Sequence, residues 1–160
     1  SRLNEKLREE RGFTYGVRSS YDARRGAGPF AISASLQADK LTIAFDDVRH
    51  ELDALLTDRP PTDKEIDDAR RSLIEGHARH FETPSALVKR YAHVFIHDLP
   101  IDDLVNFPER LLDVDVPSII AAAQRRLDPQ ALVAVVVADA EQVRGQLEAV
   151  SWAELEVIED

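Results

Sequence analysis

The chain has 160 residues, of which 44% are hydrophobic, so it is long enough to bury the core of one domain. Its 30 acidic and 20 basic residues give a net charge of −10, which opposes binding to nucleic acid or to an anionic membrane surface. Cysteine is absent, which excludes disulfides, thiolate metal sites and a thiol nucleophile. No apolar run is long enough to span a bilayer as a helix. Because the chain begins with Ser1 and contains no methionine, we expect a fragment of a longer protein. The sequence does not determine the cellular compartment, although the cytoplasm is favoured.

The first elements are a short helix and a strand joined by a tight turn. Leu3 and Leu7 lie four residues apart among charged residues, which predicts a helix with one apolar stripe over residues 1–10. Gly12 is placed to end this helix in the left-handed conformation, and Phe13 to fold back on Leu7. From Tyr15 the pattern alternates with a period of two, which predicts a strand.

This arrangement makes Arg8 and Tyr15 the candidate site residues. A guanidinium at a helix end and a phenol at a strand start, held on either side of one turn, can both aim donors at one carbonyl oxygen. In the alternative interpretation, Arg8 pairs with Glu5 or Asn4 on the helix surface and Tyr15 is an ordinary strand aromatic. Spacing alone favours the alternative, because such pairs are common.

The middle of the chain predicts a second strand and then a block of helices. A glycine-containing turn at 26–29 leads into a half-buried strand over 30–36, antiparallel to the first. Asp39 is a candidate cap for a helix with an apolar stripe over 41–55. The next helix opens with a Thr62–Glu65 capping box, and Gly76 within it suggests the close approach of a neighbour. A third helix opens at Thr83–Pro84, with Leu87, Tyr91, Val94 and Phe95 on its buried side.

The last third predicts further helices and a central strand. A helix is expected within 101–112, with Pro108 placed to split it, and Asp115 caps the next helix. The β-branched run 132–137 predicts a strand buried on both faces, 140–150 a helix and 155–158 a last strand. This order predicts an α/β (α+β) domain with a mixed, mainly antiparallel sheet and helices packed on one face.

Metal and nucleophile motifs are weak in this sequence. His77 and His80 lie three residues apart, and His93 and His97 four apart, so each pair could share a helix face. Neither HExxH nor HxxEH occurs, and no Gly-x-Ser-x-Gly elbow or phosphate-binding glycine loop is present. We therefore interpret the histidines as ordinary polar or core residues and expect no metal site in this chain.

The opening segment resembles a known family. Residues 1–17, SRLNEKLREERGFTYGV, are similar to the run S-R-L-x-x-x-L-R-E-x-x-G-L/F-x-Y-x-V in the C-terminal domain of pitrilysin/insulinase-type (inverzincin) zinc metallopeptidases. Within that family, the bacterial peptidases similar to mitochondrial processing peptidase resemble it most. The likeness continues in the family's order through residues 28–32 (GPFAI), 62–70 (TDKEIDDAR), 114–117 (VDVP) and 135–139 (VVVAD).

This resemblance implies a domain of the LuxS/processing-peptidase type, the substrate-binding half of a two-domain peptidase that closes around an extended peptide. Arg8 and Tyr15 match the family's substrate-binding pair, with the Tyr15 hydroxyl donating to the scissile carbonyl as it becomes an oxyanion, and Arg8 holding a neighbouring carbonyl. The family's zinc is bound by the other domain, through HxxEH and a downstream glutamate. The resemblance therefore leads us to expect that residues 1–160 form a single domain that lacks the catalytic residues and the family's first strands.

Two functions follow from the resemblance. The first is the substrate-binding domain of a zinc-dependent metalloendopeptidase, whose partners are the peptide substrate and the zinc-binding N-terminal domain or a partner subunit. The second is an inactive subunit or core-protein-like member that serves assembly or peptide capture. A homodimer is also among the expected assemblies, and basic peptides suit the acidic surface.

Overall fold

The structure is a computed structural model that describes residues 1–158, and contacts between Cα atoms divide it into two compact units. The first unit comprises residues 1–21, 30–58 and those from 127 onward, and the second comprises 22–29 and 59–126. In the described part of the chain, no helix combines the length and the apolar character needed to cross a membrane.

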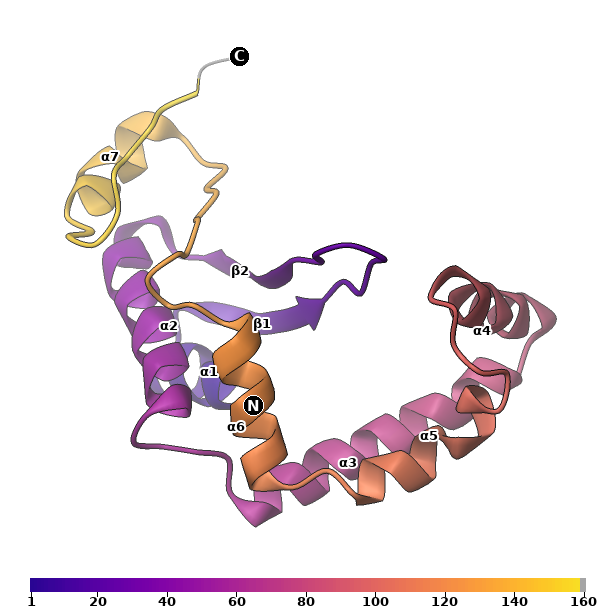
Figure 1. The fold of residues 1–160 in the computed structure, drawn as a ribbon. Helices are drawn as coiled ribbons and strands as arrows, with labels where there is room; N and C mark the ends of the chain where they lie inside the picture. The colour runs from indigo at the N-terminus through magenta and orange to yellow at the C-terminus, as the bar shows by residue number, and fades with distance from the viewer. Residues whose placement is uncertain (159–160) are drawn as a thin grey trace. The chain divides into compact units, whose positions relative to one another are not determined.

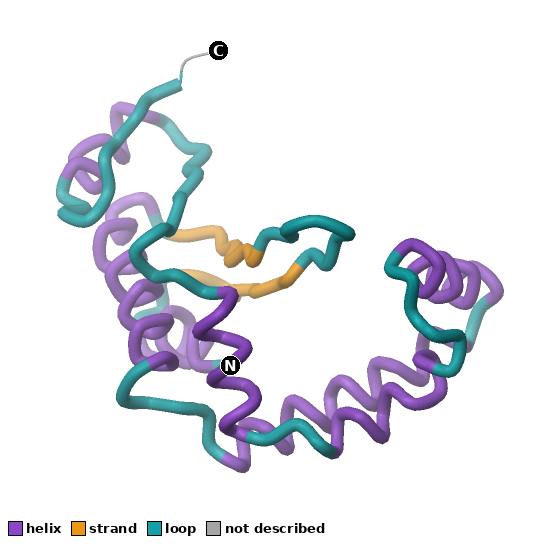
Figure 2. The backbone as a smooth tube through the Cα atoms, in the orientation of Figure 1, coloured by secondary structure: helices purple, strands orange, loops and turns teal. Residues whose placement is uncertain are grey.

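The first unit is built on a β-hairpin (Figures 1 and 2). Strand β1 (Thr14–Tyr21) pairs antiparallel with strand β2 (Phe30–Leu36), as the sequence predicted. Helix α1 (Arg2–Asn4) continues into the π-helical segment η1 (Glu5–Glu10) before β1. After β2 the chain passes through the 3-10 turn η2 (Ala38–Lys40) into helix α2 (Leu41–Leu56).

The core of this unit lies between one face of the hairpin and the helices. Leu7 from η1, Val17 from β1 and Ala44 from α2 are buried together, and partly buried side chains pack around them: Leu3, Phe13, Ile32, Leu36 and Val48. Burial of a leucine of this kind contributes roughly 1.5–3 kcal/mol to stability. The predicted α+β class, with helices against one face of an antiparallel sheet, is confirmed.

The C-terminal part of the first unit returns to helix α2. Helix α7 (Ala140–Glu148) buries Val143, and the Oγ1 of Thr42 in α2 donates a hydrogen bond to the carbonyl oxygen of Gln146 over 2.5 Å. The ring nitrogen of Trp152 donates to Asp46 over 2.8 Å, with the ring beside Phe45. The first unit is therefore closed by contacts between residues about one hundred positions apart in the chain.

The second unit is helical. Its helices are α3 (Asp63–Ala78), α4 (Pro84–Ile96), α5 (Asp103–Leu112) and α6 (Val116–Arg126), with the 3-10 turn η3 (Arg79–Phe81) after α3. Three predicted helix starts are confirmed. Thr62 and Glu65 form both bonds of a capping box, Thr83 accepts from the amide of Ala86, and Asp115 accepts from the amide of Ser118.

The predicted central strand over 132–137 is wrong. The segment is extended but has no strand assignment, and Figure 2 draws it as loop. Val133, Val135 and Val137 are 89%, 86% and 97% exposed, where burial on both faces was expected. A strand needs a neighbour to bond its main chain, and within residues 1–158 the sheet contains β1 and β2 alone. For the same reason residues 155–158 form no strand.

Four smaller predictions also need correction. Asp39 does not cap α2: it lies in η2 and pairs with Lys40 at 2.8 Å, and the N-cap residue of α2 makes no side-chain cap bond. The predicted close approach of a neighbour to Gly76 is wrong, because the nearest atom that a Cβ there would meet is in the Arg79 guanidinium, 4.0 Å away. Pro108 is accommodated inside a continuous α5. On α4, Val94 is buried, but Tyr91 and Phe95 are exposed.

Candidate functional site

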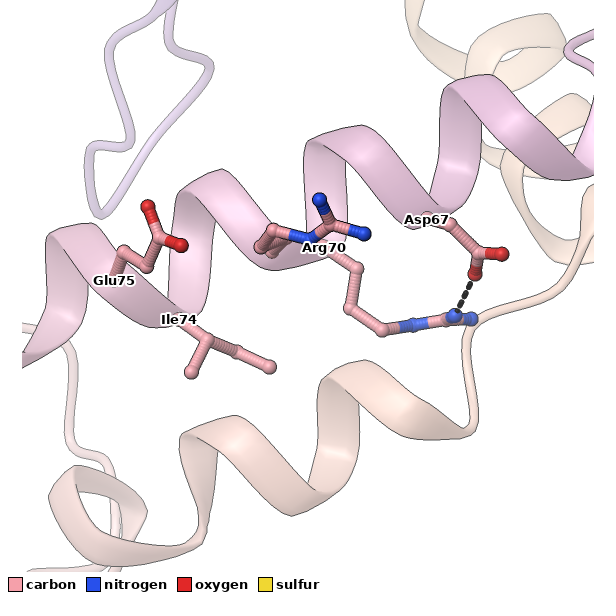
Figure 3. A pocket seen from close by; sticks show the side chains of 5 residues that line it. Asp67, Arg70, Ile74 and Glu75 are labelled. Atoms are coloured by element: carbon pink, nitrogen blue, oxygen red, sulfur yellow. Dashed lines mark hydrogen bonds and ion pairs between the residues drawn. The ribbon is translucent and has the colours of Figure 1, made fainter.

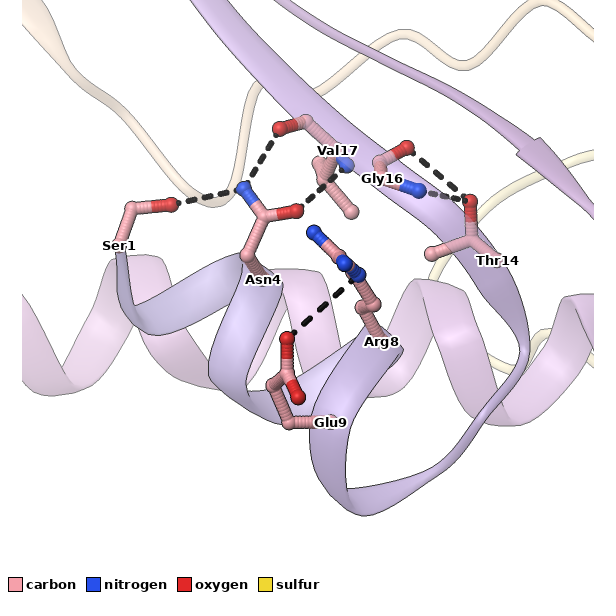
Figure 4. Close-up of polar contacts among 7 residues, drawn as sticks. All are labelled: Ser1, Asn4, Arg8, Glu9, Thr14, Gly16 and Val17. Atoms are coloured by element: carbon pink, nitrogen blue, oxygen red, sulfur yellow. Dashed lines mark hydrogen bonds and ion pairs between the residues drawn. The ribbon is translucent and has the colours of Figure 1, made fainter.

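The site predicted from the sequence lies on the helix α1–η1, the turn after it and the start of β1 (Figure 4). Gly12 ends the helix with φ +66°, as predicted, which puts the backbone in the left-handed region. The turn closes with two main-chain bonds: Gly12 N–H to the Arg8 carbonyl (3.2 Å) and Phe13 N–H to the Leu7 carbonyl (2.9 Å). The helix end that carries Arg8 is therefore held directly against the start of the strand.

A second contact fixes the same helix to its surroundings. The Arg11 guanidinium binds Asp47 of α2 with Nε at 3.0 Å and Nη2 at 3.3 Å from the two carboxylate oxygens. This hydrogen bond and the charge of Asp47 raise the pKa of Arg11 above its ordinary value. Arg11 also lies over the Phe13 ring, at 5.9 Å from its centroid. Arg11 thus holds one end of the turn to α2, and Phe13 at the other end packs against the core of the unit.

Arg8 is half-exposed at the end of this helix. Its Nε lies 3.5 Å from Glu9 Oε1, and the two side chains are 55% and 64% exposed. In the described structure the ion pair of Arg8 is to Glu9, where the alternative interpretation expected Glu5 or Asn4. An exposed ion pair of this kind contributes little stability, so the guanidinium can leave it for a ligand at low cost.

Tyr15 projects fully into solvent, at 98% exposure. Strict alternation would have placed it on the same face as Val17, which is buried at 5%. The predicted alternation fails at Tyr15 because the pairing of β1 with β2 is irregular here: Thr14 opposes Leu36 and Val17 opposes Ala34. Three steps along β1 match two along β2, which is a β-bulge with one extra residue. The bulge turns Tyr15 away from the core.

Two polar side chains support the bulge, through contacts that were not predicted from the sequence. Thr14 Oγ1 accepts from the Gly16 amide (3.1 Å) and lies 3.0 Å from the Gly16 carbonyl, to which it can donate. Asn4 Nδ2 donates to the Val17 carbonyl (2.8 Å), and Asn4 Oδ1 accepts from the Val17 amide (2.9 Å). The signal available in the sequence was an asparagine four residues before Arg8, on a helix next to a glycine-containing strand.

The histidines of the two candidate pairs have contacts within the second unit. His77 is buried and its Nε2–H donates to the Leu104 carbonyl over 2.8 Å, while the side chain of His80 lies outside the described residues. His93 and His97 have ring centroids 4.3 Å apart, and partial burial, followed by the neighbouring His97 and Arg90, lowers the pKa of His93. In the part of the chain that is described, no three His, Cys, Asp or Glu side chains gather as metal ligands.

A groove on α3 is the other candidate site, and it lies in the second unit (Figure 3). It is lined by Asp67, Arg70, Arg71, Ile74 and Glu75. Arg70 donates to the carbonyls of Leu111 and Val114, both over 2.9 Å, and pairs with Asp67 over 2.6 Å. Arg70 thus satisfies carbonyls at and beyond the end of α5, so the groove is explained by helix packing.

Residues 1–73 match the model of the peptidase M16 inactive domain. The crystal structure of a peptidase M16 inactive domain from Pseudomonas fluorescens is similar, with a TM-score of 0.72 and 28% identity over 81% of this chain. The predicted resemblance is confirmed. This match covers 30% of the Pseudomonas chain, so the present chain spans less than a third of that protein's length.

The M16 comparison supports the coarse part of the prediction, a non-catalytic domain of the pitrilysin type. The matched region contains Arg8, Tyr15 and the turn between them. No curated protein matches the chain significantly. The closer likeness to peptidases of the mitochondrial-processing type stays a prediction.

Proposed function

We propose that this chain is the substrate-binding domain of a zinc-dependent metalloendopeptidase, with Arg8 and Tyr15 as the residues that contact an extended peptide. The observation that carries the proposal is the exposure of these two donors on rigid elements joined by one tight turn. The M16 similarity over residues 1–73 supports it, because the predicted family pair falls inside that region.

The proposed chemistry follows from the donor groups. The Tyr15 hydroxyl donates to the scissile carbonyl and its hydrogen bond strengthens as negative charge develops on that oxygen. Arg8 leaves its exposed contact with Glu9 and binds a neighbouring peptide carbonyl, which fixes the register of the substrate. The Lewis acid that activates water would be a zinc ion held by the N-terminal domain or by a partner subunit. The net charge of −10 favours basic peptides as substrates.

The test uses the complete protein and a basic, quenched fluorogenic peptide. We expect Arg8→Ala and Tyr15→Phe each to lower kcat/KM by about one to three orders of magnitude, because each removes a donor to the reacting peptide. Zinc content should stay unchanged in both variants, since neither residue is proposed as a ligand.

Matched controls are available in the same chain. Arg144→Ala removes a half-exposed arginine that lies 3.9 Å from Glu148, and Tyr91→Phe removes the hydroxyl of a half-exposed tyrosine on α4. Both should keep the wild-type kcat/KM. Wild-type turnover by Arg8→Ala and Tyr15→Phe would refute the proposed roles. Peptide binding without any turnover by the wild-type protein would instead indicate the alternative, an inactive subunit that captures peptides or serves assembly.

A further inference from the structure

The Asn4 carboxamide binds both main-chain groups of a single residue, Val17, thirteen positions away. Its Nδ2 donates to the Val17 carbonyl and its Oδ1 accepts from the Val17 amide, at 2.8 and 2.9 Å. A neighbouring strand would make the same pair of bonds, so the side chain takes the place of a strand at this point of β1. The same nitrogen also lies 3.0 Å from Ser1 Oγ.

The position of this contact in β1 is specific. Val17 is the first residue after the bulge, where regular pairing with β2 resumes at Ala34. Thr14 bonds both main-chain groups of Gly16, so the bulge is held from within by Thr14 and at its end by Asn4. Tyr15 lies between Thr14 and Gly16 in the chain. The direction of the Tyr15 side chain therefore depends on the contacts made by Thr14 and Asn4.

Asn4 also lies one helical turn before Arg8, on the same side of the helix. Figure 4 shows both side chains rising from the helix toward the strand at Val17. The contact thus joins the helix that carries Arg8 to the strand that carries Tyr15. Packing of Leu7 against Val17 holds the two elements together, but apolar contacts are not directional, whereas two hydrogen bonds fix the rotation and register of the strand.

We propose that Asn4 is a positioning residue for peptide binding: its two bonds to Val17 hold the β1 bulge so that the Tyr15 hydroxyl and the Arg8 guanidinium face the same peptide. The proposal rests on the proposed function of Arg8 and Tyr15. It adds that peptide recognition depends on a side chain that does not touch the peptide.

The first part of the test is structural and needs no substrate. Hydrogen exchange of the complete protein, read by mass spectrometry, follows the amides of residues 14–21. Asn4→Ala removes the acceptor of the Val17 amide, so exchange in this segment should rise roughly fivefold to tenfold. Exchange over 63–78 should not change. Asn106→Ala is the matched control, an asparagine on α5 in the other unit, and it should leave residues 14–21 as in the wild type.

The second part is a double-mutant cycle on kcat/KM for the same basic fluorogenic peptide. Asn4→Ala should lower kcat/KM about tenfold in the wild-type background and less than about twofold in the Tyr15→Phe background, because the hydroxyl that it positions is already absent. Asn4→Asp keeps an acceptor for the Val17 amide but faces the Val17 carbonyl with a charged oxygen, so it should be intermediate or worse.

The outcomes separate the two proposals. If Tyr15→Phe keeps wild-type activity, the proposed function fails, and the positioning role falls with it. If Tyr15→Phe is impaired but the effect of Asn4→Ala is the same in both backgrounds, the function stands and the positioning role is overturned. Unchanged exchange of residues 14–21 in Asn4→Ala overturns it as well. If Asn4→Ala loses protection from hydrogen exchange over the whole of 41–56, this variant is globally unfolded. Asn4→Asp then tests the positioning role by the same two measurements, exchange of residues 14–21 and the double-mutant cycle with Tyr15→Phe.

Discussion

Gly12 allows a sharp test of how the turn between Arg8 and Tyr15 is built. A Cβ added at Gly12 would meet no atom within 4 Å, so any cost of Gly12→Ala comes from the backbone, whose φ is +66°. Placing an alanine in the left-handed region costs roughly 1–2 kcal/mol. Reduced freedom of the unfolded chain offsets roughly 0.4–1 kcal/mol of that. We expect a net loss of about 0.5–1 kcal/mol in the free energy of unfolding.

The same substitution at Gly145 should act in the opposite direction. Gly145 lies inside helix α7 of the same unit, and a Cβ there also meets nothing within 4 Å. Because alanine favours the helix interior, Gly145→Ala should stabilise by about 0.5–1 kcal/mol. The two variants should therefore differ by about 1–2 kcal/mol, which for a chain of this size is a difference of several degrees in Tm.

Denaturant unfolding followed by tryptophan fluorescence measures both variants. Trp152 is the one tryptophan of the chain, and it packs beside Phe45 in the unit that contains both glycines. Gly12→Asn should cost less than Gly12→Ala, because asparagine tolerates the left-handed region. A Gly12→Ala variant as stable as the wild type, or two alanine variants whose stabilities shift in the same direction, would contradict a backbone cost at Gly12.

Two further predictions concern the core and the pH dependence. Leu7→Ala should lower the free energy of unfolding by about 2–5 kcal/mol, because Leu7 is 1% exposed between β1 and α2. Val133 is 89% exposed, so Val133→Ala should change the free energy of unfolding by less than about 0.5 kcal/mol. Equal effects of the two substitutions would contradict the described core. The folded state holds the pKa of His93 below its ordinary 6.5, mainly by burial. Its contribution to stability is thus present above pH 6.5 and is lost as the pH falls through the folded value. In urea unfolding at a series of pH values, His93→Gln should reduce the loss of stability seen below pH 6.5. If the pH dependence of stability is the same in the variant and the wild type, His93 does not contribute to it.

Much of the fold could be predicted because the signals are local. A capping box needs only Thr62 and Glu65, three residues apart, and the structure shows both of its bonds. The helix end at Gly12 could be predicted from two local patterns, an apolar stripe that stops before it and an alternating pattern that starts after it. Such features are decided within one turn of backbone, so the sequence contains all the information that they require.

Pairing between distant segments could not be predicted in the same way. The run 132–137 has the composition of a buried strand, but composition does not supply a neighbour, and among the described residues no strand bonds it. The bulge at Thr14–Val17 was also missed. An extra residue in one strand depends on which side chains satisfy its main chain, and here one of them, Asn4, lies thirteen positions away from Val17.

The exposure of Tyr15 is informative because the fold could have avoided it. Without the bulge, alternation would place Tyr15 on the face of Val17, in reach of the core, and burying a ring of about this size stabilises by roughly 1.5–3 kcal/mol. The chain instead uses Thr14 and Asn4 to hold an irregular strand that turns the ring to 98% exposure. Thr14 and Asn4 thus hold an aromatic side chain in solvent, near a half-exposed arginine. This arrangement does not add to stability, and it is better explained by contact with another molecule.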